Sequence, residues 1–390
     1  MLVNYAGVSF RSIRKIISSI EICLQLSIKA PTHATVLNWV KKQGIANFQN
    51  KEYFQNQSWI LIVDESIQFG NKKLLAVVAV PNDKNVVNRT LRYTDLVPLI
   101  LKSSNSWSAE EIKAEIENCI AIEQVSYAVS DNGHNLTSSF SKLGVKHIED
   151  VSHKFSLIIK NVYDKHTEFE AYTKKLAEMR TKLSLSQFSH ILPPKQRVIS
   201  RFMNLTPLFR WGVKMLKLIK KGHLSELEQE KVKFVLEYSE LIQNTYTILL
   251  TLNKIQKLLK TKGFNKETIQ KAKLLLEKIK DGNTEKIRIQ INQYFEQTIQ
   301  KMSEDATFLC TSDILESCFG KYKEIVKENK TVGITDLCLC IPAFLGEQNN
   351  KDKTRNAMSI IKNSDIELWK AKNIGETLYE KRCNFFKKAG

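Results

Sequence analysis

The chain lacks any long apolar run. No uninterrupted stretch approaches the ~20 apolar residues that a membrane-spanning helix needs. The N-terminus also lacks a basic segment followed by a clean apolar stretch, which is the pattern of a secretory signal peptide. These two absences predict a cytoplasmic protein that makes no membrane contact.

Cysteines are few, and none is placed as a zinc ligand. Seven cysteines occur in 390 residues without a Cys-x-x-Cys pair, and Cys338 and Cys340 lie in an apolar, strand-like run. An odd number of thiols in a long chain is typical of a reducing compartment. We therefore expect reduced, buried thiols and no zinc site.

Acidic residues are in deficit. Asp and Glu number 41 against 59 Lys and Arg, a net charge of +18. An excess of this size points to a polyanionic partner, most often nucleic acid, with a merely basic protein as the alternative. The 43% hydrophobic and 26% charged residues are ordinary for a globular protein, and the length allows two or three domains with a large core.

Residues 1–48 have the pattern of two short helices. Apolar positions recur at helical spacing over 13–24, and Thr32 is placed to cap a second helix that ends at Gly44. In a basic protein this pattern predicts a helix-turn-helix DNA-binding domain, with a simple helical hairpin as the alternative. The candidate DNA contacts there are Asn38 for bases and Lys41 and Lys42 for phosphates.

Residues 58–152 alternate strands and helices, which predicts an α/β domain. The apolar run 59–63 ends in Asp64, and the run 125–129 leads to Asp131. A carboxylate that follows a buried strand stands at the sheet end where ligands bind. If the two strands are neighbours, the carboxylates repel each other unless a cation such as Mg²⁺ joins them. The alternative for Asp131 is a simple turn, because Ser-Asp-Asn-Gly is a good turn sequence.

The remaining chain changes pattern twice. Residues 153–308 are almost entirely helical in pattern. Residues 309–345 hold one more helix, which bears Glu316, and a final apolar segment. Residues 346–390 are polar and charged, and we expect a loosely held tail.

The segments around three acidic residues resemble a known family. Ile-Val-Asp-Glu-Ser at Asp64, Ser-Asp-Asn-Gly at Asp131 and Ile-Leu-Glu-Ser-Cys-Phe-Gly-Lys-Tyr-Lys at Glu316 are similar, in this order, to the DDE transposases of bacterial insertion sequences. The likeness covers roughly residues 1–345. It implies a ribonuclease H-like mixed sheet in which the three residues are the catalytic carboxylates and hold two Mg²⁺ or Mn²⁺ ions.

The resemblance also implies an organisation and a function. Residues 58–152 and 309–345 would form the catalytic core, and 153–308 an all-helical insertion within it. The enzyme would cut double-stranded DNA at terminal inverted repeats and join the 3′-hydroxyl ends to target DNA. A homodimer in the DNA complex and a nucleoid-associated place in a bacterial cytoplasm follow. The alternatives are a DNA-binding protein with a degenerate ribonuclease H-like domain, or another ribonuclease H-like nuclease.

Other residues receive supporting roles. Asp150-Val-Ser-His153 is similar to a Cys-or-Asp, two residues, His signature of several transposase families, and its alternative is a histidine bonded to Asp150 at a helix start. Lys323 lies two helical turns after Glu316 and is a candidate phosphate contact, with a solvated lysine on a basic helix as the alternative. Trp211 is a candidate for stacking on a flipped base, with a core tryptophan as the alternative. The candidate phosphate contacts beside it are Arg197, Arg201 and Arg210.

Three further acidic residues must be compared with the predicted metal ligands. Glu65 points to the strand face opposite Asp64, so we do not expect it to be a ligand. Glu304 and Asp313 are rivals for the third carboxylate. Glu316 is preferred because basic residues follow it on the same helix.

Overall fold

The computed structural model divides the chain into two compact units. It describes residues 3, 6–27, 29–49, 58–69, 72–196, 201–277, 282–301, 306–326, 333–346 and 351–388. One unit comprises Met1–Ile148 with Thr311–Gly390, and the other Glu149–Cys310. The second unit contains the range 153–308 that the sequence pattern marked as helical.

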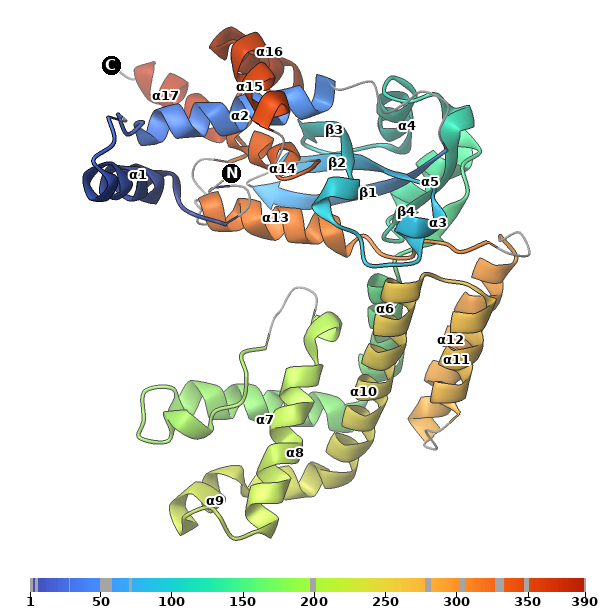
Figure 1. The fold of residues 1–390 in the computed structure, drawn as a ribbon. Helices are drawn as coiled ribbons and strands as arrows, with labels where there is room; N and C mark the ends of the chain where they lie inside the picture. Colours follow the sequence, from blue (N-terminus) through green and yellow to red (C-terminus); the bar gives the residue numbers. More distant parts are fainter. Residues whose placement is uncertain are drawn as a thin grey trace. The chain divides into compact units, whose positions relative to one another are not determined.

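A mixed five-stranded sheet forms the centre of the first unit (Figure 1). Its strands are β1 (Trp59–Phe69), β2 (Lys72–Pro81), β3 (Val97–Ser104), β4 (Val125–Ser130) and β5 (His147–Glu149), in the spatial order β3-β2-β1-β4-β5. β2 is antiparallel to β1 and β3, whereas β1 is parallel to β4. The chain is therefore of the α/β class, and the sheet is compatible with a ribonuclease H-like core.

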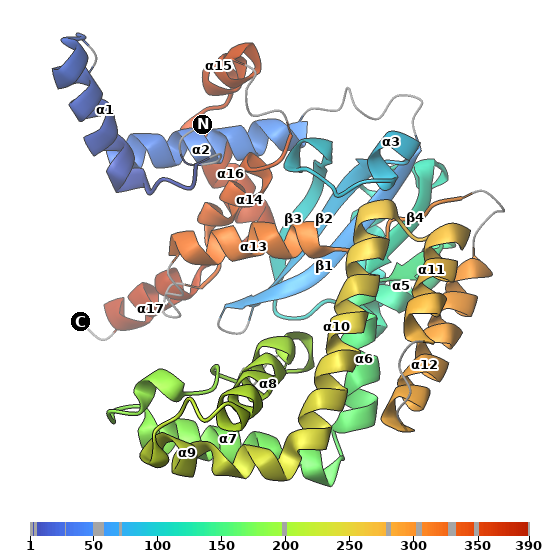
Figure 2. The same ribbon diagram turned by 60° about the horizontal axis from the view of Figure 1, so that its bottom comes forward.

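The two faces of β1 have different neighbours. Leu61 and Val63 belong to a buried cluster with residues of α4 (Ala109–Glu117) and α5 (His134–Leu143). Because side chains alternate along a strand, Ile62 and Asp64 lie on the other face. α13 (Asp313–Val326) packs against β1 and contributes nothing to that cluster, so it covers the face of Asp64 (Figures 1 and 2).

The N-terminal helices fall within this unit. Ser9 caps α1 (Phe10–Leu24). Thr32 accepts a bond from the Thr35 N–H at the start of α2 (His33–Gln49), as expected. The sequence suggested that the second helix ends at Gly44, but α2 does not end there. It continues and packs against α14 (Cys340–Ala343) and the preceding 3₁₀ turn, Asp336–Leu339. The segment of Cys338 and Cys340 is thus helical and not strand-like.

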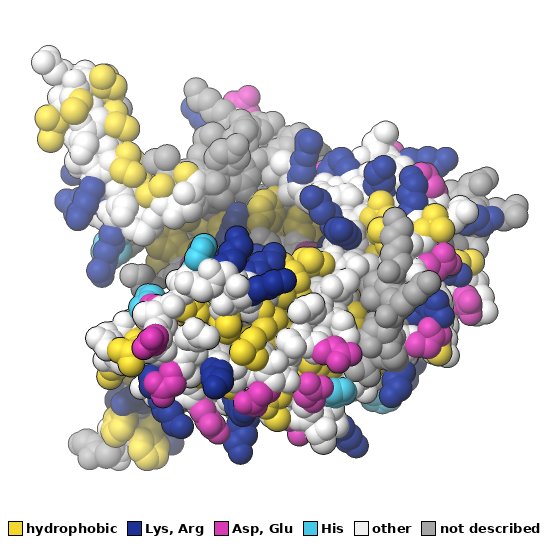
Figure 3. All heavy atoms as spheres, turned by 90° about the horizontal axis from the view of Figure 1, so that it is seen from below, with side chains coloured by type: hydrophobic (Ala, Val, Ile, Leu, Met, Phe, Trp, Pro, Cys, Tyr) yellow, Lys and Arg dark blue, Asp and Glu magenta, His cyan; other side chains and the backbone are white. Residues whose placement is uncertain are grey.

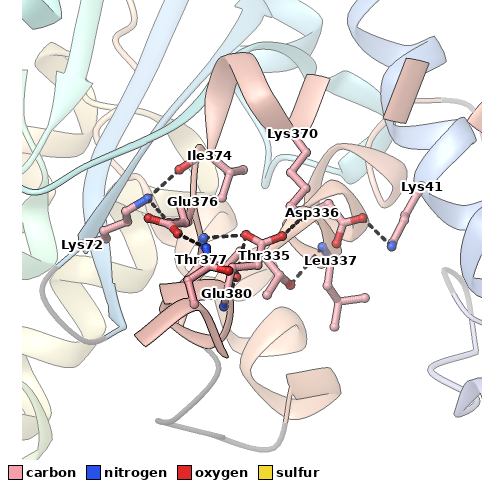
Figure 4. Close-up of polar contacts among 11 residues, drawn as sticks. Lys41, Lys72, Thr335, Asp336, Leu337, Lys370, Ile374, Glu376, Thr377 and Glu380 are labelled. Carbon is pink, nitrogen blue, oxygen red and sulfur yellow. Dashed lines mark hydrogen bonds and ion pairs between the residues drawn. The ribbon is translucent and has the colours of Figure 1, made fainter. Parts of the chain in front are cut away.

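The C-terminal segment 346–390 is not the loose tail that its polarity suggested. It contains α15 (Lys351–Ile360), α16 (Asn363–Asn373) and α17 (Leu378–Lys387), and α16 packs against α2 and β3. Lys72 Nζ donates to the carbonyl oxygens of Ile374 and Glu376, at 2.6 and 2.9 Å (Figure 4). Buried Ile366 and Ile374 explain why this polar sequence stays attached.

The second unit consists of helices, apart from Glu149 at the end of β5 and one bridge between Phe264 and Phe308 in its described part. The helices are α6 (Val151–Tyr163), α7 (Thr167–Leu183), α8 (Thr206–Lys220), α9 (Glu226–Val232), α10 (Ser239–Lys262), α11 (Lys266–Leu276) and α12 (Gly282–Ile299). Stacked and tilted aromatic rings, Phe169 with Phe209 and Tyr172 with Tyr238 among them, build its core.

The structure bears on two expectations, namely the lack of a membrane-spanning helix and the burial of the cysteines. Throughout the ranges given above, no helix has both the length and the apolar character needed to cross a membrane. All seven cysteines are free thiols. Four of them, Cys310, Cys318, Cys338 and Cys340, are buried as expected, whereas Cys23 and Cys119 are exposed.

Gly44 tests the packing of α2 against the C-terminal elements. A Cβ at this position would clash with the backbone carbonyl of Leu339, which cannot move aside as a side chain could. We expect Gly44→Ala to lower the free energy of unfolding by about 1–3 kcal/mol, measured by urea titration. Gly320→Ala is the matched control, because its Cβ would meet open space on α13 and should stabilise the helix by about 0.5–1 kcal/mol. Equal effects of the two variants would contradict this packing.

The attachment of α17 to α16 should weaken in acid. The side-chain bond from Lys370, at 2.5 Å, and the Thr377 N–H lower the pKa of Glu380 to about 2 from a usual value near 4.5 (Figure 4). A carboxyl with a lowered pKa stabilises the fold above its unfolded value, and this contribution is lost as the pH falls from about 4.5 towards 2. We expect hydrogen exchange of residues 363–387, corrected for its intrinsic rate, to accelerate over that range. Glu380→Gln should remove most of the pH dependence, and an unchanged dependence would refute the assignment.

Candidate active site

The apolar run 59–63 had suggested that Asp64 stands at the end of a strand. In the structure, Asp64 lies within β1. The strand continues to Phe69, but the pairing with β2 becomes irregular between Asp64 and Ile67. The parallel pairing with β4 reaches only Ile62 and Val129. Asp64, 9% exposed, therefore stands where β1 parts from β4. Such irregularities redirect a strand and are common beside functional sites.

Asp131 directly follows the last residue of β4. Ile62 is the partner of Val129, so continuing this register by two residues places Asp131 beside Asp64. Neighbouring strands lie ~4.8 Å apart, and residues in register on parallel strands face the same side. The two strands that lead to the sequence-predicted aspartates are thus neighbours in the sheet, and the register, continued beyond its last pair, would put Asp131 level with Asp64.

Asp131 also makes the turn that its sequence predicted. Its Oδ1 accepts a hydrogen bond from the Gly133 N–H at 3.1 Å, which turns the chain into α5. This bond uses one carboxylate oxygen only. The turn and a ligand role for Asp131 are therefore compatible, and the turn limits how the carboxylate can rotate.

Ser130 and His147 fix the backbone of Asp131, and sequence reasoning missed both. The buried Ser130 hydroxyl donates to the Asp131 carbonyl oxygen at 2.7 Å, and His147 Nε2 lies 2.9 Å from the same hydroxyl. Because the hydroxyl has one proton, His147 must donate from Nε2. Its ring stacks on Phe140 at 5.2 Å between centroids. The signal in the sequence was weak: a polar residue at the end of one strand and a histidine starting the next.

Glu316 lies in the first turn of α13, the helix that covers the Asp64 face of the sheet. Ser312 immediately precedes the helix, and the Thr311 hydroxyl accepts from the Asp313 N–H at 3.2 Å. Glu316 and Asp313 are both half-buried in this turn. The other rival, Glu304, lies outside the described residues.

Basic and aromatic side chains surround the same turn. Ser317 Oγ lies 2.7 Å from the Tyr93 hydroxyl, and Lys321 Nζ stands 4.0 Å from the centre of the Tyr93 ring. Lys323 is exposed on α13. A lysine over an aromatic face gains cation–π attraction, so Lys321 is held while Lys323 projects into solvent. The exposure of Lys323 fits both a phosphate contact and a solvated lysine.

The three proposed carboxylates are not assembled into one group. Among the residues that the structure describes, no three or more His, Cys, Asp or Glu side chains lie close enough together to hold a metal ion. The two aspartates come from neighbouring strands, and Glu316 belongs to the helix that packs against β1. Glu65 points away, as expected, and pairs with Lys73 at 3.1 Å.

Asp150 and His153 act at the start of α6, in the second unit. Asp150 Oδ1 accepts from the backbone N–H groups of Ser152 and His153, at 2.7 and 2.9 Å, and lies 3.2 Å from His153 Nδ1. Asp150 is fully buried. The pair is therefore a helix N-cap with a histidine bonded to it, which was the alternative interpretation of this motif.

The residues predicted to contact DNA differ in their exposure to solvent. Lys41 forms an ion pair with Asp336 at 2.5 Å and is mostly buried, so it is not available for a phosphate in this arrangement. Trp211 is 8% exposed and its indole N–H donates to the Ile191 carbonyl at 3.1 Å, so base stacking by Trp211 is wrong and the core alternative holds. The candidates that stay partly or fully exposed are Asn38, Lys42 and Arg210. Arg197 and the side chain of Arg201 lie outside the described residues.

No protein-family model matches the chain, and no curated protein is significantly similar to it in sequence. The functional assignment therefore depends on the geometry of these residues.

The cap of α6 yields a stability prediction. Asp150→Ala leaves two backbone donors buried without an acceptor and should lower the free energy of unfolding by about 1–2 kcal/mol. Asp150→Asn retains an acceptor oxygen and should retain most of that stability. Urea unfolding of both variants measures the difference. If Asp150→Asn destabilises as much as Asp150→Ala, the carboxylate charge matters more than the cap.

Proposed function

We propose that this chain is a DDE transposase, which cuts DNA at the ends of an insertion sequence and joins the 3′-hydroxyl ends to target DNA. The observation that supports this most is the parallel pairing of β1 with β4, the two strands that lead to Asp64 and Asp131. α13 brings Glu316 to the same face of the sheet. A net charge of +18 suits a DNA substrate.

The residues fit a divalent cation. With Asp131 level with Asp64, which is nearly buried, the two carboxylates would repel each other, and a cation between them would remove that repulsion. Hard oxygen donors of this kind suit Mg²⁺ or Mn²⁺. Asp64 and Asp131 would hold the metal, and Glu316 would complete the ligand set. Two such ions supply an activated attacking oxygen and a stabilised leaving oxygen in phosphodiester chemistry.

The chain's own residues have positional roles in this proposal. The turn at Gly133 and the Ser130 hydroxyl fix Asp131, so its carboxylate does not have to be ordered when metal and DNA bind. Lys323 would hold a DNA phosphate next to the glutamate turn. No side chain forms a covalent bond with DNA in this scheme.

The organisation of the chain supports the same proposal. If the mixed sheet is ribonuclease H-like, a helical unit can be inserted between β5 and α13, the helix of Glu316. The chain has a helical unit at that position. The exposed side of α2, with Asn38 and Lys42, would contact the terminal inverted repeats. Two DNA ends must be held together for joining, so a homodimer on DNA belongs to the proposal.

A second candidate is a DNA-binding protein whose ribonuclease H-like domain does not cleave. The absence of an assembled three-acid group in the described parts of the chain favours it. A nuclease that cuts without joining is the third possibility. Cleavage and joining assays separate all three.

The decisive assay uses plasmid DNA carrying the flanking terminal repeats, Mg²⁺ and purified protein. We expect metal-dependent nicking at the repeat ends and joining of the cut ends to a second DNA. Asp64→Asn, Asp131→Asn and Glu316→Gln should each lower the nicking rate by about 10²-fold or more, because loss of even an outer-shell partner of a metal ligand costs 10–100-fold. Glu65→Gln is the matched control and should cleave normally, since Glu65 faces the other side of β1.

Each other outcome points to a different conclusion. Nicking that survives Asp131→Asn would show that the active site is elsewhere. An active Glu316→Gln beside an inactive Asp313→Asn would move the third carboxylate to Asp313. DNA binding without nicking by the unaltered protein would support the second candidate, and nicking without joining the third.

A further inference from the structure

One face of α8 in the helical unit carries a row of positive charges. Arg210, Lys214, Lys217 and Lys221 follow one another at intervals of four, three and four residues, and all four are exposed. At 3.6 residues per turn these intervals keep them on one side of the helix, over a length of roughly 16 Å. We call this row the α8 basic stripe.

The opposite face of α8 is fixed in the core of the unit. Its buried residues include Leu208, Phe209, Trp211 and Met215, and α8 packs against α10. The Trp211 indole donates to a backbone carbonyl, and a Cβ at Gly212 would meet the Tyr172 hydroxyl at 2.6 Å, so the helices approach closely. The stripe is therefore presented by a helix that cannot easily rotate.

The four side chains of the stripe are unpaired in the described structure. None of them takes part in an ion pair or a hydrogen bond there, although lysines elsewhere in the unit, Lys175 with Glu237 for example, do. Figure 3 shows Lys and Arg side chains gathering in several places on one face of the molecule. Favourable interaction with the helix dipole explains basic residues in the last turn, but not Arg210 or Lys214 near the start and middle of α8.

The chemistry of the stripe favours a nucleic acid backbone over other anionic partners. A helix that binds a membrane surface needs a free apolar face, and the apolar face of α8 is buried. A protein partner is usually anchored by aromatic or aliphatic contacts, and the stripe consists of charges alone. Phosphates along duplex DNA need only a row of positive charges, and roughly 16 Å corresponds to about five base pairs at ~3.4 Å each.

We propose that the α8 basic stripe binds the phosphate backbone of double-stranded DNA without regard to sequence. Its biological meaning deepens the proposed function, on which that meaning rests: the helical unit would hold DNA that the carboxylates cut. The binding itself is independent of cleavage.

The test measures affinity for a short duplex of arbitrary sequence in EDTA, over a series of salt concentrations. The variant is Arg210→Gln with Lys214→Gln, Lys217→Gln and Lys221→Gln. The matched control removes the same charge from four exposed lysines of α7 and α10, as Lys174→Gln, Lys182→Gln, Lys254→Gln and Lys257→Gln. Each lost phosphate contact lowers the slope of log affinity against log salt by about 0.9, so the stripe variant should lose about three to four and the control less than one.

The affinity of the stripe variant near 0.1 M salt should fall by about tenfold or more relative to the control. A charge-keeping variant, Arg210→Lys with Lys214→Arg, Lys217→Arg and Lys221→Arg, should bind as the unaltered protein does. If the fourfold neutral variant does not fold, Arg210→Gln with Lys214→Gln and Lys217→Gln with Lys221→Gln should each show about half of the slope change.

Other results would overturn the proposal. A stripe variant that binds duplex as tightly as the control, with the same slope, rules the stripe out. So does a variant that keeps duplex binding but loses binding to phosphatidylserine vesicles or to polyglutamate. Because EDTA prevents metal-dependent cutting, Asp131→Asn should keep the full slope. If the unaltered protein never cleaves DNA but the stripe variant still loses the salt dependence of binding, the transposase proposal is refuted and the stripe proposal stands.

Discussion

The register between β1 and β4 is the constraint on which the rest of the candidate site depends. Side chains on a strand alternate between two faces, so a slip of one residue in β1 would turn Asp64 into the cluster of α4 and α5. A carboxylate buried there would lose its hydration without a partner, which is costly. The same slip would remove Leu61 and Val63 from that cluster. Ordinary core packing therefore fixes the position of Asp64, and the neighbouring strand β4 leads directly to Asp131.

Distant parts of the chain complete the first unit around this sheet. Val36 and Val40 of α2 share a buried cluster with Cys340 and Phe344, and Ile45 shares another with Ile361 and Ile366. The ends of the chain thus build one body with the sheet. A DNA-reading role for α2 is limited to its outer side, because its inner side has a structural task. This is the physical reason why Lys41, on that inner side, pairs with Asp336 instead of remaining free.

The sequence predicted the local features better than the long-range contacts. Apolar runs located β1 and β4, and the alternation of side chains along a strand correctly predicted that Glu65 points away from Asp64. Gly44 was misinterpreted as a helix end because glycine usually stops helices, but here it permits close approach to Leu339. Trp211 was ambiguous because only the fold supplies the Ile191 carbonyl for its indole. The C-terminal helices were missed because a polar segment with a few isoleucines shows its apolar side only when a partner surface is known.

The place where the helical unit joins the chain suggests why the site tolerates it. α6 begins at the Asp150 cap, and the Val151 N–H donates to the Cys310 carbonyl at 2.9 Å, so the entry and exit of the unit are bonded to each other. An insertion whose two ends meet occupies the place of a closed loop in the surrounding fold. The entropic cost of closing a loop grows slowly with its length. The unit can therefore be large, and carry a surface such as the α8 basic stripe, while the strands of Asp64 and Asp131 and the helix of Glu316 keep the connections they would have with a short loop.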